Sequence, residues 1–187
     1  MTRRLFVSVD LDGLANEVRT VQDPFEGASG LTLTDPEQAH VTLKFLGDVE
    51  PDRVTAVREA LDAAVDDTGL GPFEMAVGGL GVFPSLDYIS VLWVGVRSGG
   101  DELTRLHRAV EDRTTAIDFP PEDHEFTPHV TIARMEHAGS KDLVQRAVRN
   151  DDPDVGWRRV EEIRLKESVL GADGPTYETV ERFPLDG

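Results

Sequence analysis

The chain has 187 residues, 39% of them hydrophobic, and no cysteine. This length suits one compact domain, and the lack of cysteine excludes a disulfide framework, a thiol nucleophile and a thiolate metal site. Thirty-six acidic against 19 basic residues give a formal net charge of −17, which argues against nucleic-acid binding through a broad basic surface.

Hydrophobic periodicity predicts the elements of the first half of the chain. Leu5–Asp10 alternates as a strand does, and Leu11–Val21 has helical spacing. His40–Leu46 is the second predicted strand. Pro51 then opens a predicted helix that continues to Val65.

The second half shows a similar succession. Its predicted elements are strands over Phe73–Val77 and Tyr88–Val96, a helix over residues 101–115, a strand over Phe126–Met135, a helix over Lys141–Asn150, and strands over Val160–Leu170 and Tyr177–Phe183. The glycine-rich residues 78–84 are predicted to be a connection between strands. They lack the pattern of a nucleotide-binding loop.

Two copies of one short pattern carry the candidate chemistry: His-Val-Thr-Leu at residues 40–43 and His-Val-Thr-Ile at residues 129–132. Side chains alternate along a strand, so the histidine and threonine of each copy share one face. Histidine can move a proton near neutral pH, and a threonine hydroxyl can donate a hydrogen bond to a phosphate oxygen. Two such pairs facing each other would hold one phosphate and supply an acid and a base.

These observations predict an α+β fold of largely antiparallel sheets with helices packed outside. Each motif lies in a β-rich half that is followed by an amphipathic helix. We therefore expect residues 1–187 to form a single domain of two similar lobes. The lobes would be related by an approximate two-fold axis, with both motifs lining a central cleft.

Charge and hydropathy also bear on where the chain works. The surplus of acid with scarce lysine resembles proteins adapted to concentrated salt, where screening removes the repulsion. No segment approaches the roughly 20 apolar residues of a membrane span, and the first apolar run is too short for a signal peptide. We expect a cytoplasmic monomer with no membrane association.

The basic residues that follow the two motifs are expected to face in different directions. By simple alternation Lys44 falls on the face of His40 and Thr42, whereas Arg134 faces away from the second motif unless a bulge or twist intervenes.

The sequence resembles the two-histidine (2H) phosphoesterase superfamily, and within it the RNA 2′,3′-cyclic phosphodiesterases once named 2′-5′ RNA ligases. The resemblance covers nearly the whole chain. The segments that carry it are Arg4–Asp10, His40–Gly47, Gly79–Pro84, Val91–Val96, Thr127–Arg134 and Gly174–Tyr177. It implies a two-lobed α+β fold and hydrolysis of a terminal 2′,3′-cyclic phosphate on RNA to a 2′-phosphate, with no metal and no cofactor.

The resemblance also implies roles for single residues. His40 would donate a proton to the leaving 3′ oxygen and His129 would accept one from water, although the sequence fits the reverse assignment equally well. The motif threonines, Thr42 and Thr131, would hold the non-bridging oxygens. Arg134 matches the family's position after the second motif.

Two further site candidates rest on the residues alone. Lys44 is a candidate phosphate ligand because of its expected face. Phe45 is a candidate wall of the base or ribose pocket, although an aromatic residue in a strand more often belongs to the core.

Two other functions are alternatives. One is ATP-independent ligation of RNA ends through a 2′-5′ bond, which uses the same groups with a ribose hydroxyl in place of water. A variant of this chemistry opens a small cyclic phosphate such as ADP-ribose 1″,2″-cyclic phosphate. The other is a non-catalytic module that binds RNA ends or a cyclic nucleotide, for which arginine or lysine would serve without paired histidines.

The remaining histidines are assigned no role. His107 is expected on the surface of a helix, His124 in an acidic turn and His137 in a loop. No His-x-x-x-His or HExxH spacing indicates a metal site.

If the chain acts on RNA, its charge predicts that affinity depends on the end group and only weakly on RNA length. Counterion release contributes little in concentrated salt, so a long RNA and a dinucleotide with the same cyclic end should bind with similar affinity. Competition binding in high potassium chloride measures this. A large advantage for the long RNA would instead indicate an extended basic groove.

Overall fold

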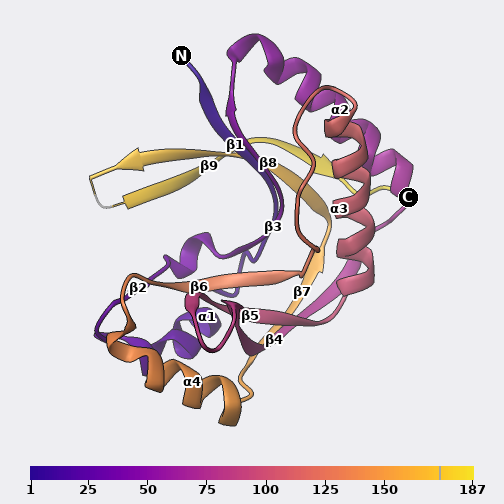
Figure 1. The fold of residues 1–187 in the computed structure, drawn as a ribbon. Coiled ribbons are helices and arrows are strands. Elements are labelled where there is room, and N and C mark those ends of the chain that lie inside the picture. Colours follow the sequence, from indigo (N-terminus) through magenta and orange to yellow (C-terminus); the bar gives the residue numbers. More distant parts are fainter. Residues whose placement is uncertain (173) are drawn as a thin grey trace.

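The computed structural model describes residues 1–172 and 174–187 and confirms the α+β class (Figure 1). The strands that it describes form one antiparallel sheet in the order β7-β4-β5-β6-β3-β1-β8-β9, with β2 paired to β6. They are β1 (Arg3–Asp10), β2 (Leu31–Leu33), β3 (His40–Val49), β4 (Phe73–Pro84), β5 (Ile89–Ser98), β6 (His129–Met135), β7 (Asp154–Val160), β8 (Glu162–Gly171) and β9 (Gly174–Pro184).

The helices cover one side of this curled sheet (Figure 1). They are α1 (Ala15–Gln22), α2 (Val54–Thr68), α3 (Gly100–Thr115) and α4 (Lys141–Asn150). The helices α2 and α3 pack together against the β3-β1-β8-β9 part, whereas α1 and α4 lie against the β6-β5-β4-β7 part. No helix among the described residues is long and apolar enough to cross a membrane.

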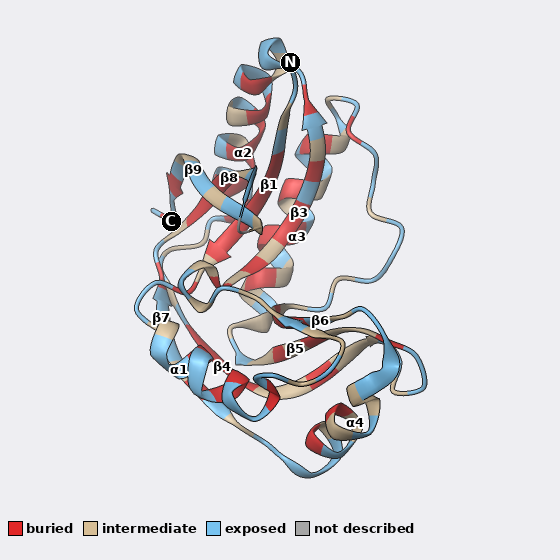
Figure 2. Cartoon of the chain, turned by 90° about the vertical axis from the view of Figure 1, so that its left-hand side faces the viewer, coloured by how far each residue is buried: buried red, intermediate tan, exposed pale blue. Residues whose placement is uncertain are grey.

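Apolar side chains on one face of each helix pack against the sheet. Val57 and Leu61 on α2, and Leu103 and Leu106 on α3, are completely buried. Figure 2 shows this buried layer continuing through the central strands. Burying each such side chain contributes about 1.5–3 kcal/mol to the stability of the fold, so these contacts hold the helices against the sheet.

The two parts of the sheet meet at one residue pair. In the part of the chain that the structure describes, β3 and β6 pair only through Val41 and Val130, both of which are fully buried. Each valine is the residue between the histidine and the threonine of its motif. The junction of the sheet therefore lies within the two motifs themselves.

The predicted connection over residues 78–84 is wrong, because β4 continues without a break to Pro84. Glycine is disfavoured inside strands, but here it makes room for neighbouring side chains. A Cβ atom on Gly81 would collide with the ring of Trp93, and one on Gly78 would collide with the side chain of Arg97.

Other boundaries differ where periodicity carries little signal. The predicted strand over Val160–Leu170 corresponds to β8, which begins at Glu162, whereas Val160 is the last residue of β7. Most of β7 and the short β2 are absent from the prediction. The first helix begins at Ala15, four residues later than predicted. The helix over Lys141–Asn150 has the predicted bounds.

Candidate functional site

The junction of β3 and β6 brings the two motifs side by side. The antiparallel pairing of Val41 with Val130 means that the residues on either side of each valine lie next to the other motif. These flanking residues are His40 and Thr42 on β3, and His129 and Thr131 on β6. They lie on the opposite face from the buried valines and are only partly buried.

Hydrogen bonds fix the ring of His40. Its Nδ1 lies 2.9 Å from the carbonyl oxygen of Gln38, and its Nε2 lies 3.0 Å from Oγ1 of Thr42. A carbonyl only accepts, so Nδ1 carries the proton that it donates to Gln38. In the neutral ring Nε2 is then the acceptor, and the Thr42 hydroxyl donates to it.

The ring of His129 is held in the same way. Its Nδ1 donates to the carbonyl oxygen of Thr127 at 2.6 Å. In both motifs the acceptor is therefore the carbonyl two residues before the histidine. The shared tautomer leaves Nε2 of each neutral imidazole as the basic nitrogen, which is the atom needed for proton transfer.

Burial lowers the pKa of both histidines below the ordinary value of 6.5. For His40, the hydrogen bond to Gln38 and the negative charge of Asp10 oppose this shift, and the positive charge of Lys166 adds to it. For His129, the hydrogen bond to Thr127 opposes the shift, and the positive charge of Arg134 adds to it. The two imidazoles thus have different electrostatic surroundings.

A β-bulge follows each motif and changes the face of the residues after it. Two adjacent residues of β1, Ser8 and Val7, pair with Thr42 and Lys44 of β3. Leu43 therefore has no partner on β1 and is the extra residue of the bulge. Phe6 then pairs with Phe45. Phe45 consequently shares the face of Thr42, and 63% of its surface is exposed.

The bulge on β6 has the same position. Trp93 pairs with Thr131 and Leu92 pairs with Ala133, which leaves Ile132 extra. Arg134 therefore shares the face of Thr131 and is exposed. Simple alternation had predicted that it faces away, and the bulge is the reason that it does not.

The predicted position of Lys44 on the face of His40 and Thr42 is wrong. The bulge at Leu43 turns its side chain to the helix side, where it is 2% exposed. There its Nζ forms an ion pair with Glu111 of α3 and donates to the carbonyl oxygen of Pro120 at 2.9 Å. Lys44 thus ties β3 to α3 and is not available to a phosphate.

Sequence reasoning missed the residues that surround His40. The rings of Phe6 and Tyr177 lie 5.1 and 5.3 Å from its imidazole, between centroids. Asp10 is directly opposite His40 in the pairing of β1 with β3. The alternation of β1 places Phe6, Ser8 and Asp10 on one face, but the sequence does not reveal which strand lies beside them.

Asp10 belongs to a charged cluster on β1 and β8. Its carboxylate accepts hydrogen bonds from Ser8 at 2.6 Å, Lys166 at 2.7 Å and Arg164 at 2.8 Å. Burial alone would raise the pKa of Asp10, but the hydrogen bonds from Lys166 and Ser8 and the two positive charges outweigh it and lower the pKa. Asp10 is therefore ionised at neutral pH beside His40.

Aromatic rings also surround His129. Phe83 contacts it edge-on at 4.8 Å between ring centroids, and Trp93 lies 5.8 Å away. The residue opposite His129 is Gly95, which carries no charge. The first motif therefore has an acidic neighbour across the strand, whereas the second has a glycine there.

The other histidines lie outside this arrangement. The predicted surface position of His107 is wrong: it is 9% exposed, its Nδ1 donates to the carbonyl oxygen of Leu43 at 2.8 Å, and its ring stacks on Phe126. His124 and His137 are exposed. In residues 1–172 and 174–187, no group of three or more histidine, aspartate or glutamate side chains is placed to hold a metal ion.

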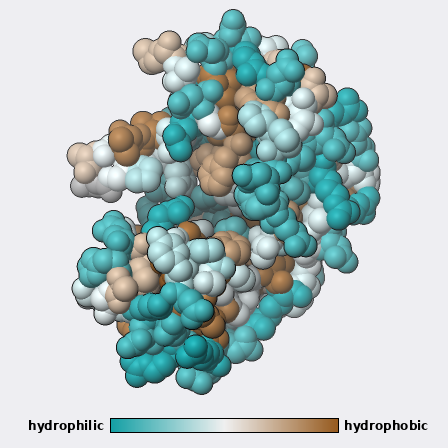
Figure 3. All heavy atoms as spheres, viewed as in Figure 1, coloured by the Kyte–Doolittle hydropathy of each residue, from teal (hydrophilic) through white to brown (hydrophobic). Residues whose placement is uncertain are grey.

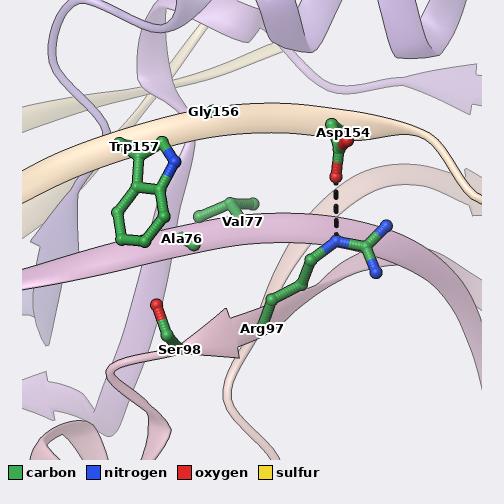
Figure 4. Close-up of a pocket in the computed structure, with 7 residues that line it drawn as sticks. All are labelled: Ala76, Val77, Arg97, Ser98, Asp154, Gly156 and Trp157. Atoms are coloured by element: carbon green, nitrogen blue, oxygen red, sulfur yellow. Dashed lines mark ion pairs between the residues drawn. The ribbon is translucent and has the colours of Figure 1, made fainter.

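A separate pocket of about 390 Å³ lies on β4, β5 and β7 (Figure 4). Arg97 and Trp157 line it, and neither histidine–threonine motif contributes to it. The Nε of Arg97 pairs with Asp154 at 2.9 Å, and Asp152 accepts a further hydrogen bond from the same guanidinium. Its cation is therefore already neutralised.

Comparison with known proteins places this geometry in context. Residues 11–168 match the sequence model of the 2′-5′ RNA ligase superfamily. The chain is 35% identical to an RNA 2′,3′-cyclic phosphodiesterase of Methanothermobacter thermautotrophicus, covering 99% of this chain and 100% of that protein. It is 32% identical to a protein of the same name from Archaeoglobus fulgidus, covering 96% and 99%.

Solved structures share the fold. A protein from Thermus thermophilus superposes with a TM-score of 0.77 at 26% identity, with 97% of each chain covered. E. coli LigT, in a structure with 3′-AMP, superposes with a TM-score of 0.79 at 20% identity over 100% of both chains. At that identity the second likeness concerns the fold alone.

The position of Lys44 predicts a structural role. Replacing it with alanine leaves the Glu111 carboxylate without this cation, so the free energy of unfolding should fall by about 3–5 kcal/mol. Urea denaturation measures this change. Arg113→Ala is the control, because it breaks an exposed pair with Asp67 and should have a much smaller effect. Equal stability of the two variants would contradict the role given to Lys44.

Proposed function

Because this chain belongs to the 2′-5′ RNA ligase superfamily, we propose that it hydrolyses 2′,3′-cyclic phosphates at RNA ends to 2′-phosphates. The observation that carries this proposal is the pairing of Val41 with Val130, which sets two histidine–threonine pairs side by side. Relatives that match over nearly their whole length are named for the same reaction.

The reaction requires two proton transfers on opposite sides of the phosphorus. A water oxygen forms a bond to phosphorus while the bond from phosphorus to the 3′ oxygen breaks. The attacking water loses a proton, and the leaving 3′ oxygen gains one. Two imidazoles whose Nδ1 atoms are held by backbone carbonyls can each use Nε2 for one transfer, and exchange with solvent then restores their protonation.

The surroundings of the histidines favour His40 as the acid and His129 as the base. The ionised Asp10 opposite His40 stabilises a protonated imidazole, as an acid requires. The positive charge of Arg134 favours a neutral imidazole at His129, as a base requires. The cation of Lys166 acts against the first effect, so this assignment depends on Asp10.

The threonines and Arg134 would bind the phosphate. When His40 is protonated, its Nε2 can no longer accept from Oγ1 of Thr42, which frees the threonine hydroxyl proton for a phosphate oxygen and leaves the Nε2 proton for the 3′ oxygen. Thr131 has the corresponding place in the second motif. Arg134 would add a positive charge where negative charge develops. The exposed ring of Phe45 would form a wall of the ribose or base pocket.

Removing either histidine should stop turnover. His40→Ala and His129→Ala should each lower the rate by about 10²–10⁴, the usual contribution of one general acid or base. The substrate is an oligoribonucleotide with a 2′,3′-cyclic end, in high potassium chloride with a chelator, and phosphorus NMR identifies the product. His137→Ala, which alters an exposed histidine, should retain activity.

The same assay separates the alternatives. A 2′-phosphate product supports hydrolysis, whereas a new 2′-5′ linkage in the presence of 5′-hydroxyl RNA would support ligation. Binding of the cyclic end without any conversion would contradict the proposal and favour a non-catalytic module. Full activity in either motif variant would contradict the two-histidine mechanism.

The pH dependence should report the lowered pKa values. Both imidazoles have a pKa below 6.5, so kcat/KM should follow a bell-shaped curve with its maximum below pH 6.5. Asp10→Asn removes the negative charge that favours protonated His40, so the maximum should move to lower pH. Steady-state rates over a pH series measure this.

Asp12→Asn is the control for that shift. Asp12 also binds Arg164, at 2.5 Å, but Asp10 is the residue that lies opposite His40 in the pairing of β1 with β3. Replacement of Asp12 should leave the maximum in place. Circular dichroism checks that both variants are folded, and an unmoved maximum in folded Asp10→Asn would contradict the role of Asp10.

A further inference from the structure

We propose that one face of the β8–β9 hairpin binds the nucleobase of the nucleotide that precedes the cyclic end of the RNA. This proposal rests on the proposed function and extends it to a second subsite. The subsite consists of Leu170 on β8 and Pro175 on β9, which are directly paired. The hairpin projects from the body of the molecule beside the concave side of the sheet (Figure 1).

The register of the strands connects this face to the catalytic histidine. Lys166 pairs with Phe6, whose ring contacts His40, so Lys166 lies on the catalytic face of the sheet. Side chains alternate along β8, and therefore Leu170 lies on the same face as Lys166. On β9, Tyr177 contacts the His40 ring, and Pro175 shares its face.

The distance along the hairpin from Tyr177 to Leu170 fits the spacing between neighbouring nucleotides. Tyr177 is paired with Ser168, and Leu170 lies two residues further out along β8. Two residues of a strand span about 7 Å, so Leu170 lies about 7 Å beyond the position of Tyr177. If the terminal nucleotide binds beside Tyr177, the base of the preceding nucleotide would contact the apolar face of the hairpin.

The exposure of this face is unusual for a strongly acidic surface. Leu170 is 85% exposed, whereas Val169 on the other face of the strand is 38% exposed. Figure 3 shows hydrophobic side chains on the projecting hairpin, separated by a notch from the lower part of the molecule. Isolated exposed apolar residues are common, but this pair continues the face of β9 on which the half-buried Tyr177 lies, beside the buried ring of Phe6.

Charge favours a nucleobase over a phosphate as the occupant. The cations near His40 are already bound to carboxylates: Lys166 to Asp10, and Arg164 to Asp10, Asp12 and Glu162. A net charge of −17 does not favour binding of a negatively charged phosphate along the hairpin. Stacking or apolar contact with a base needs no cation and is tolerant of sequence.

The test compares two substrates that differ by one nucleotide. Adenosine 2′,3′-cyclic phosphate fills the terminal subsite alone, and the dinucleotide ApA with a 2′,3′-cyclic end fills both. The wild-type chain should have a higher kcat/KM for the dinucleotide. Leu170→Ser should lower kcat/KM for the dinucleotide about five- to tenfold, through KM, and leave the mononucleotide unchanged.

Two matched variants complete the experiment. Val169→Ser alters the opposite face of the same strand and should change neither substrate. Leu170→Phe keeps an apolar side chain and should retain the preference for the dinucleotide. Since Leu170 is exposed, its replacement does not disturb the core.

Each contrary outcome has its own meaning. Equal loss on both substrates, or no loss on either, in Leu170→Ser would overturn the subsite. So would a wild-type chain that does not prefer the dinucleotide, or a Val169→Ser variant with the same defect. If the wild-type chain converts neither substrate, the proposed function itself fails. Turnover by the wild type therefore tests the function, and the ratio between substrates tests the subsite.

Discussion

The arrangement of the site depends on one backbone pairing. Among the described residues, Val41 and Val130 alone pair β3 with β6, and each is the middle residue of its motif. Both valines are completely buried, so they anchor the motifs to the core from one face. The histidines and threonines then have only the other face available. A shift of this register by one residue would move the histidine and threonine side chains into the core.

The two bulges decide what else reaches the site. Each inserts one residue directly after a motif threonine, at Leu43 and at Ile132. Because a bulge reverses the alternation, the third residue after each threonine lies on the same face as the histidine and threonine. In the first half that residue is Phe45, and in the second it is Arg134. One half therefore offers an aromatic surface and the other a cation.

The halves differ most in the charge beside their histidines. Asp10, held by Ser8, Lys166 and Arg164, lies across from His40, whereas Gly95 lies across from His129. Two histidines with the same tautomer and the same backbone contact thus have different environments. The proposed mechanism uses this asymmetry, with one imidazole as the acid and the other as the base.

The sequence by itself determined the α+β class, the helices that cover the sheet and the pairing of histidine with threonine on one face. These follow from local periodicity, which the tertiary structure leaves intact. Only the tertiary structure decided that Lys44 and His107 are buried and that the glycine-rich segment belongs to strand β4. Each depends on a partner distant in the sequence: Glu111 for Lys44, Leu43 for His107 and Trp93 for Gly81. A bulge likewise belongs to a pair of strands, and so the face of Lys44 and Arg134 is fixed only when β3 and β6 pair with their neighbours.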